Sequence, residues 1–365
     1  MSAQPSHGTV LVTGGLGYIG SHAVVALEAA GHRTVIIDNL TNSERTVLPR
    51  LERLCGRAVP FLGGDVRDGE FVEHALRRHD VVACVHFAGL KSVAASVEQP
   101  LTYYDVNVGG TVALLAAMRR AGTRRLIFSS SATVYGTPGR VPIPETAATV
   151  PTNPYGRSKL TAETVIDDEC AARPELAAMS LRYFNPAGAH ASGLIGERPR
   201  GRPDNLMPYV SQVAAGLRPH VDVFGIDYPT PDGTGVRDYV HVVDLAEAHV
   251  RALETLPHTG GHARLNLGTG RGYSVLELIH AYQRATGRRV PYAMAPRRAG
   301  DIAECFADAS LAEALLDWKA GLSLEDMCRD AARFESAMAD GGESMRIHQR
   351  HPSAARPESA TQRTG

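Results

Sequence analysis

A glycine-rich turn follows directly on a short run of β-branched residues near the start of the chain. Residues 9–13 read TVLVT, and residues 14–20 read GGLGYIG. The spacing fits G-x-x-G-x-x-G from Gly14 or G-x-G-x-x-G from Gly15. Glycines at these positions permit a tight turn and the close approach of a pyrophosphate, whose charge then lies at a helix N-terminus. The chain is therefore restricted to folds in which a buried strand leads through this turn into a helix.

Strand-like and helix-like segments alternate through the first third of the chain. Strands are predicted at 9–13, 33–38, 59–62, 81–86 and 125–129, with helices at 18–30, 68–78 and 107–121. Further helices are predicted at 205–216, 244–255, 274–286 and 324–338. Strands that alternate with helices indicate βαβ units and a parallel sheet covered on both faces. The predicted fold class is α/β: a Rossmann doubly wound parallel sheet with a smaller α/β domain that binds substrate.

An acidic residue closes the second predicted strand. Asp38 lies 18 residues after Gly20, where a carboxylate accepts hydrogen bonds from the ribose hydroxyls of a dinucleotide. Because the same carboxylate would repel a 2′-phosphate, NAD is favoured over NADP as the cofactor. The segments GDV at 64–66 and HFAG at 86–89 follow the third and fourth strands. Ligands of open α/β sheets bind at these strand ends.

We expect the 365 residues to divide into four parts. Residues 1–8 form a short leader, and residues 9–184 form the NAD-binding Rossmann domain. Residues 185–340 form mainly the substrate-binding domain, with part of the chain crossing back to the first domain. Residues 341–365 form a polar tail that is predicted to be disordered.

Composition limits the partners that such a chain can have. The 38 Lys and Arg balance 39 Asp and Glu, so the formal net charge is −1 and a nucleic-acid partner is not expected. No apolar stretch reaches the ~18 residues of a membrane span, and the start has no secretory pattern. The five cysteines are odd in number and widely spaced, which predicts neither disulfides nor a metal site. A cytoplasmic protein is therefore expected.

A tyrosine and a lysine lie four residues apart in the segment YGRSK at 155–159. If Asn153 caps a helix that starts at Pro154, Tyr155 and Lys159 share one helical face. A nearby cation favours the phenolate of a tyrosine, whose free pKa is about 10. Tyr155 is therefore predicted to act as a base near neutral pH. A serine triplet at 129–131 ends the preceding strand.

An ordered series of motifs surrounds these residues: VTGGLGYIGSH, IIDNLTNSER, HFAGLKSVAASV, SSSATVYG, NPYGRSKL, RYFNPAGAH and FGIDYPTPDGTGVRDYVHV. Through them the chain resembles the extended short-chain dehydrogenase/reductase family from about residue 9 to residue 334. Within this family it is similar to the enzymes that invert C4 of a UDP-hexose. The resemblance implies an isomerase of galactose metabolism, which interconverts UDP-glucose and UDP-galactose through a 4-keto intermediate while NAD stays tightly bound.

The resemblance also implies roles for individual residues. Tyr155 would be the general base toward the sugar 4-hydroxyl, Lys159 would tune it and hold the nicotinamide ribose, and Ser131 would hydrogen-bond the same hydroxyl. The implied cofactor-binding residues are Gly14, Gly17, Tyr18, Ile19, Gly20, Asp38, Asn39, Leu40, Thr41, Asn42, Ser43, Asp65, Val66, Phe87, Ala88, Gly89, Leu90, Lys91, Asn107, Ser131, Tyr155, Lys159 and Phe184. The implied substrate-binding residues are Ser131, Tyr155, Asn185, Asn205, Leu206, Phe224, Arg237, Arg298, Asp301 and Cys305. The two arginines would hold the pyrophosphate of the nucleotide sugar, whose oxygens match their planar fork.

Two alternatives stay open. The first is another nucleotide-sugar enzyme of the family, either a 4,6-dehydratase or a UDP-glucuronate decarboxylase or epimerase. Dehydratases of the family carry an acid pair just after the active-site serine or threonine, whereas residues 131–135 read SATVY. The second is a non-catalytic NAD-sensing protein, which would have no need of Tyr155 and Lys159.

Substrate breadth and assembly are also implied by the resemblance. Cys305 lies where the family lines its sugar pocket. A small residue there leaves space for an N-acetyl group, so activity on UDP-GlcNAc and UDP-GalNAc is predicted as well. The resemblance further implies a homodimer formed through the helices at 107–121 and 155–171.

Overall fold

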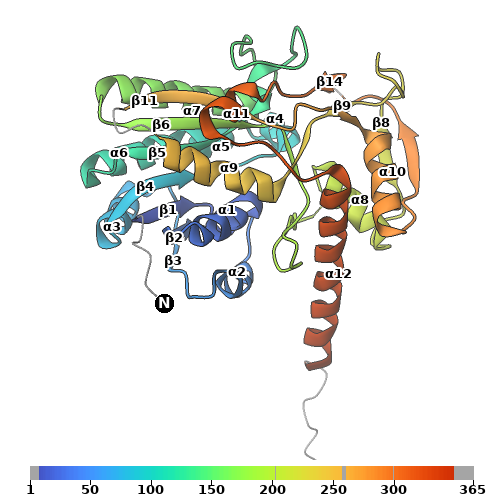
Figure 1. Ribbon diagram of the computed structural model, residues 1–365, viewed down its shortest axis with the longest axis horizontal. Coiled ribbons are helices and arrows are strands. Elements are labelled where there is room, and N and C mark those ends of the chain that lie inside the picture. Colours follow the sequence, from blue (N-terminus) through green and yellow to red (C-terminus); the bar gives the residue numbers. More distant parts are fainter. Residues whose placement is uncertain (1–7, 202, 257–259, 299, 349–365) are drawn as a thin grey trace, which may run out of the picture.

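A seven-stranded parallel sheet forms the larger part of the computed structural model, which describes residues 8–348 apart from 202, 257–259 and 299. Along residues 340–348 only the backbone is described. The strands lie in the order β11-β6-β5-β4-β1-β2-β3 (Figure 1). Their bounds are β1 (Thr9–Thr13), β2 (Arg33–Asp38), β3 (Phe61–Gly63), β4 (Val81–His86), β5 (Arg125–Ser131), β6 (Ala177–Tyr183) and β11 (Gly261–Leu267). The predicted Rossmann class is confirmed.

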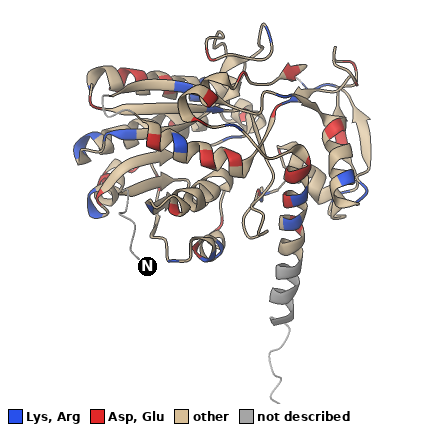
Figure 2. Cartoon of the chain, viewed as in Figure 1, with Lys and Arg blue, Asp and Glu red and all other residues tan. Residues whose placement is uncertain are grey.

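Helices cover both faces of this sheet because successive side chains of a buried strand point to opposite faces. In β1, Val10 and Val12 pack in one core cluster and Leu11 packs in the other. The first face is covered by α1 (Tyr18–Ala29), α2 (Val47–Cys55), α9 (Val242–Thr255) and α11 (Ser310–Leu316). The second is covered by α3 (Gly69–Arg78), α6 (Gly110–Ala121) and α7 (Pro154–Ala172). On the helices in view in Figure 2, basic and acidic residues are interspersed.

Shorter strands and three helices form a second body beside the large sheet (Figure 1). The strands are β7 (Asn185–Ala187), β8 (Val221–Phe224), β9 (Val236–Arg237), β10 (Tyr239–His241), β12 (Tyr273–Ser274), β13 (Tyr292–Ala295) and β14 (Glu304–Cys305). The helices are α8 (Leu206–Ala214), α10 (Val275–Thr286) and α12 (Leu324–His348). They share a core that includes Val210, Ile279, Tyr282 and Met327. Because β11 lies in the large sheet, the chain crosses between the two bodies more than once.

Some boundaries differ from those predicted by periodicity. The chain around 107 forms a π-helical turn, η1 (Tyr104–Gly109), before α6 begins at Gly110. Short helices α4 (Val93–Glu98) and α5 (Pro100–Tyr103) precede it, and a 3₁₀ turn, η2 (Ala132–Tyr135), follows β5. Helix α12 continues to His348, so the helix ends later than the start predicted for the polar tail at residue 341. The rest of that tail and nearly all of the leader lie outside the described residues.

None of the helices in the described part of the chain is long and apolar enough to cross a membrane.

Candidate active site

A cavity of about 560 Å³ opens at the carboxyl ends of the parallel strands. Its walls are the glycine turn after β1, the loops after β2, β3 and β4, the end of β5 and the start of α7. All but two of the residues that sequence assigns to cofactor binding line this cavity. The exceptions are Leu40, which packs against the core, and Asn107, which lies behind the wall.

The glycine turn leaves no room for side chains. Gly14 adopts φ of +70°, and a Cβ built there would lie 2.8 Å from the backbone nitrogen of Ala88. A Cβ on Gly20 would lie 2.2 Å from the carbonyl oxygen of Gly14. Helix α1 starts after Gly17, which caps it without a side chain. The backbone amides at this helix start are thus open to a pyrophosphate, and the turn fits the diphosphate of NAD.

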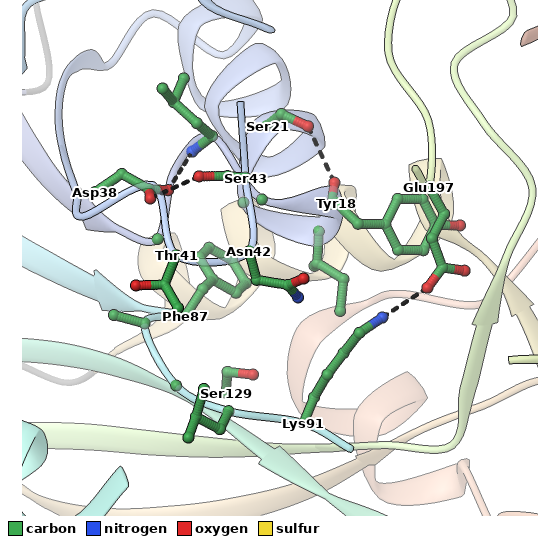
Figure 3. Close-up of a pocket in the computed structure, with 18 of the residues that line it drawn as sticks. Tyr18, Ser21, Asp38, Thr41, Asn42, Ser43, Phe87, Lys91, Ser129 and Glu197 are labelled. Atoms are coloured by element: carbon green, nitrogen blue, oxygen red, sulfur yellow. Dashed lines mark hydrogen bonds and ion pairs between the residues drawn. The ribbon is translucent and has the colours of Figure 1, made fainter. Parts of the chain in front are cut away.

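Asp38 is fixed at the end of β2 by three donors. Its Oδ2 accepts from the backbone nitrogen of Leu16 at 3.1 Å, and its Oδ1 accepts from the nitrogen of Leu40 at 2.9 Å. The Oδ1 atom also accepts from the Ser43 hydroxyl at 2.7 Å (Figure 3). The carboxylate therefore shapes its own loop while it lines the cavity, which is where a ribose hydroxyl of NAD needs an acceptor.

Ser131, Tyr155 and Lys159 meet on the opposite wall. Helix α7 begins as the sequence predicts, with Asn153 Oδ1 accepting from the Gly156 nitrogen at 2.8 Å and with Pro154 in the first position. Ser131 Oγ accepts from the Thr133 nitrogen and hydroxyl, at 3.2 and 3.0 Å. Its own proton is then available to Tyr155, to whose phenol Ser131 is hydrogen-bonded.

The electrostatics of Tyr155 differ from the expectation based on spacing. Burial raises the pKa of its phenol, and the hydrogen bond from Ser131 is the group that opposes the shift. The Lys159 ammonium faces β5. There Nζ donates to the carbonyl oxygen of Ser129 at 2.8 Å and lies 4.9 Å from the ring centre of Phe128. Spacing of four residues places two side chains on one face but does not set where their ends point.

Asn107 supports this wall from behind. Its Nδ2 donates to Ser158 Oγ at 2.9 Å and to the Leu90 carbonyl at 3.1 Å, while its Oδ1 accepts from the Leu90 nitrogen at 2.7 Å. The side chain is buried and belongs to the π turn η1. It therefore links α7 to the loop after β4 that lines the cavity.

Two cavity residues that sequence reasoning missed come from the segment between β7 and α8. Glu197 forms an ion pair with Lys91 at 2.6 Å (Figure 3), and its Oε1 also accepts from Asn205 Nδ2 at 2.7 Å. Arg200 donates to the carbonyl oxygens of Thr41 and Ser43, at 3.1 and 2.7 Å. The sequence carries no local signal for the contacts with Lys91, Thr41 and Ser43 beyond the glycines and prolines of a loop, because these partners are more than 100 residues away.

The residues assigned to the substrate fall into two groups. Asn185 and Asn205 line the cavity. Phe224, Arg298 and Asp301 lie together in the second body: the Arg298 guanidinium is 4.8 Å from the Phe224 ring centre, and its Nε donates to Asp301 at 2.9 Å.

Two further substrate residues are joined to that second group. Arg237 on β9 and Cys305 on β14 are paired in register. Arg237 and Arg298 both act electrostatically on Tyr239, so the two guanidinium groups approach the same site. Leu206, the remaining residue, begins α8. This second group does not line the cavity described above.

A Rossmann sheet whose dinucleotide cavity also contains Ser131, Tyr155 and Lys159 defines the class of the short-chain dehydrogenases/reductases. Residues 11–331 match the family described as GDP-mannose 4,6 dehydratase, which belongs to the extended branch of that class. A UDP-glucose 4-epimerase of Neisseria meningitidis serogroup C is 50% identical over 333 residues, which are 91% of this chain and 98% of the relative. The UDP-glucose 4-epimerase of Mus musculus is 51% identical over 339 residues, which are 91% of this chain and 98% of the relative. The chain belongs to the UDP-glucose 4-epimerase family.

Solved structures agree with this assignment. The UDP-glucose 4-epimerase of Stenotrophomonas maltophila, solved with bound NAD and formylated UDP-arabinopyranose, superposes with a TM-score of 0.90 at 54% identity. It covers 92% of this chain and 100% of its own. The UDP-glucose 4-epimerase of Bifidobacterium longum, solved with NAD+ and UDP, superposes with a TM-score of 0.88 at 49% identity. The superposition covers 91% of this chain and 99% of that structure's chain.

Proposed function

We propose that this protein inverts C4 of UDP-glucose and UDP-galactose, with NAD as its resident cofactor. The observation that carries the proposal is that one cavity is lined both by the glycine turn with Asp38 and by the set Ser131, Tyr155 and Lys159. The relatives from Neisseria meningitidis and Mus musculus are UDP-glucose 4-epimerases, and the two solved neighbours bind NAD together with UDP or a UDP-sugar.

In this proposal the reacting proton moves to the Tyr155 phenolic oxygen. The Ser131 hydroxyl is hydrogen-bonded to that oxygen and so stabilises the phenolate that accepts the proton from the sugar 4-hydroxyl. NAD, which the glycine turn and Asp38 would hold, would supply the hydride acceptor and donor for C4. Lys159, held by the Ser129 carbonyl, supports the same wall of the cavity with its ammonium.

Inversion requires the hydride to return to the opposite face of C4, so the keto sugar must turn over within the site and its other end needs an anchor. Arg237 and Arg298 are proposed to hold the diphosphate, with Phe224 beside the uracil and Asp301 toward the ribose. Asn185 and Asn205 line the cavity and are proposed to contact the substrate there. Anchoring at the nucleotide lets the sugar turn without leaving the site.

The acids around the cavity argue against elimination of water. Among the described residues, those that line it are Asp38, Glu44, Asp65 and Glu197. None of them belongs to the turn after Ser131, where η2 reads ATVY. A dehydratase needs a proton donor next to the active-site hydroxyl, so the site lacks the group required for that reaction.

Incubation of the purified protein with UDP-galactose, without added NAD, tests the proposal. We expect UDP-glucose to form, measured by chromatography, because a cofactor that is returned to its starting state can stay bound. A 4-keto-6-deoxy product would instead identify a dehydratase. A protein that binds NAD but leaves UDP-galactose unchanged would be a sensor or an enzyme specific for UDP-glucuronate, and each of these results would reject the proposed reaction.

Cys305 is proposed to make the sugar pocket wide enough for N-acetyl sugars. It is partly exposed and packs against the cluster that contains Ala132 and Phe184, the immediate neighbours of Ser131 and Asn185. We expect Cys305→Tyr to keep turnover of UDP-galactose and to lose turnover of UDP-GalNAc, since overpacking costs about 1–3 kcal/mol. Steady-state rates of both substrates measure this.

Cys305→Ala is the matched control, because it keeps the residue small and should retain both activities. If the unmodified protein has no N-acetyl activity, the argument from residue size is wrong.

A homodimer in the cytoplasm completes the proposal. The faces of α6 and α7 form a groove whose apolar floor includes Val112, Leu115, Ala116 and Val165. Val112 is 47% exposed, so a partner surface would remove apolar area from water. All five cysteines are free thiols, which fits a reducing compartment.

A further inference from the structure

Helix α7 carries a third polar residue in line with the catalytic pair. Tyr155, Lys159 and Glu163 follow one another at intervals of four residues and share one face of the helix. Each is joined to a different member of the serine triplet at 129–131 that ends β5. Tyr155 is hydrogen-bonded to the Ser131 hydroxyl, and Lys159 donates to the Ser129 carbonyl oxygen at 2.8 Å. Glu163 Oε1 accepts from the Ser130 hydroxyl at 2.5 Å. The reaction proposed above uses the first two residues of this row and leaves Glu163 without a role.

Glu163 is a charged group in the interior. Its side chain is 1% exposed, and Arg182 on β6 donates to it twice, from Nη2 at 2.6 Å and from Nε at 3.0 Å. Arg264 on β11 lies 3.3 Å away. Burial alone would raise the pKa of this carboxyl, but the Arg182 hydrogen bonds and charge outweigh burial and lower it. The carboxylate is therefore ionised although it is buried.

Lys159, one turn earlier on α7, is a functional group whose charge depends on this carboxylate. Burial lowers the pKa of Lys159 to about 8, and Glu163 is the group that opposes the fall. Among the other titratable groups around this wall, His86 on β4 feels the charge of Lys159, while Tyr183 on β6 and Tyr103 on α5 feel that of Tyr155. Burial and Lys159 lower the pKa of His86 to about 3, so His86 is neutral and adds no positive charge that would repel the Lys159 ammonium.

We propose that Glu163 is a positioning residue of this site: its buried carboxylate, fixed by Arg182 and the middle serine of β5, keeps Lys159 charged and directed at the end of β5. This inference rests on the proposed epimerase function, in which Lys159 supports Tyr155. Without the carboxylate, the negative charge that opposes the effect of burial is lost, so the Lys159 ammonium loses its proton at a lower pH. Activity should then fall as the pH rises through the neutral range, and it should be recovered on the acidic side.

The chain allows this to be measured directly, because it contains three lysines, Lys91, Lys159 and Lys319. In protein labelled with ¹⁵N and ¹³C lysine, each side-chain nitrogen gives one NMR signal whose shift follows its titration. We expect Glu163→Gln to move the Lys159 midpoint down by about one pH unit, the low end of shifts caused by one neighbouring charge. The Lys319 midpoint should not move, since its side chain is 75% exposed and distant. The alkaline limb of the pH profile of kcat should shift in the same direction as the Lys159 midpoint.

Two further variants separate this role from a loss of packing. Arg264→Gln removes one partner of Glu163 but keeps its charge, so its Lys159 midpoint and pH profile should match those of the unmodified protein. Glu163→Gln combined with Arg182→Met removes both buried charges. This double variant leaves no unpaired arginine in the interior, so it is expected to fold even if Glu163→Gln alone does not. It should shift the Lys159 midpoint in the same direction by a smaller amount, because the positive charge of Arg182 is removed as well.

An unshifted Lys159 midpoint in either Glu163 variant overturns the inference, and so does an equal shift in Arg264→Gln. If the unmodified protein does not convert UDP-galactose, the proposed function fails, whereas the lysine titration still decides whether Glu163 sets the charge of Lys159.

Discussion

Replacement of Tyr155 by phenylalanine is expected to lower kcat for UDP-galactose by about 10²–10⁴-fold, the range of a lost general base. The ring packs edge to face with Tyr103, at 6.4 Å between centres, and phenylalanine preserves this contact. Only the phenolic oxygen that bonds Ser131 is lost. Fold and cofactor content should stay unchanged. Rates at saturating substrate and the amount of NAD released on denaturation measure both parts of the prediction.

The matched control for this variant is Tyr104→Phe, which also removes one phenolic hydroxyl. Tyr104 belongs to η1 and does not line the cavity. It should retain the rate of the unmodified protein. A Tyr155→Phe enzyme with near-normal turnover would show that another group accepts the proton.

Substitution of Gly20 by alanine is expected to abolish retention of NAD. The added Cβ would lie 2.2 Å from the Gly14 carbonyl oxygen and 2.9 Å from the Cα of Gly15. Both are backbone atoms of the turn, so the turn itself must open, and the amides at the start of α1 no longer converge on a diphosphate. We expect the purified variant to contain almost no NAD and to lack epimerase activity unless NAD is added in large excess.

Gly139→Ala is the control for this substitution, because a Cβ at that position meets no atom within 4 Å. It should keep one NAD per chain. If Gly20→Ala also keeps its full content of NAD, the close backbone approach at this turn is not what holds the cofactor.

Local signals in the sequence were sufficient for much of the cofactor half of the site. The bounds of β1, β2 and β4 coincide with the β-branched runs, and the cap of α7 is the predicted Asn153. These features depend on residues within a few positions of one another. Asp38 shows the limit of such reasoning: its place at the strand end was predictable, but the three donors that orient it come from two loops.

Predictions were weaker where side chains from distant parts of the chain meet. The pairs Glu197–Lys91 and Arg182–Glu163 join different elements, and no local pattern marks them. The sign of the Tyr155 pKa shift was also missed, because it depends on how deeply α7 packs against β5 and on where Lys159 ends.

The sequence by itself determined the parallel sheet, the glycine turn and the common helical face of Tyr155 and Lys159, because each follows from periodicity, from backbone freedom or from capping over short spans. The tertiary structure alone decided which groups surround those residues. Burial sets the proton affinities of Tyr155 and Lys159, and the packing of α7 on β5 and β6 brings Glu163 to an arginine that keeps it ionised. Solvent exclusion and long-range contacts arise only when the elements assemble, so no stretch of sequence specifies them alone.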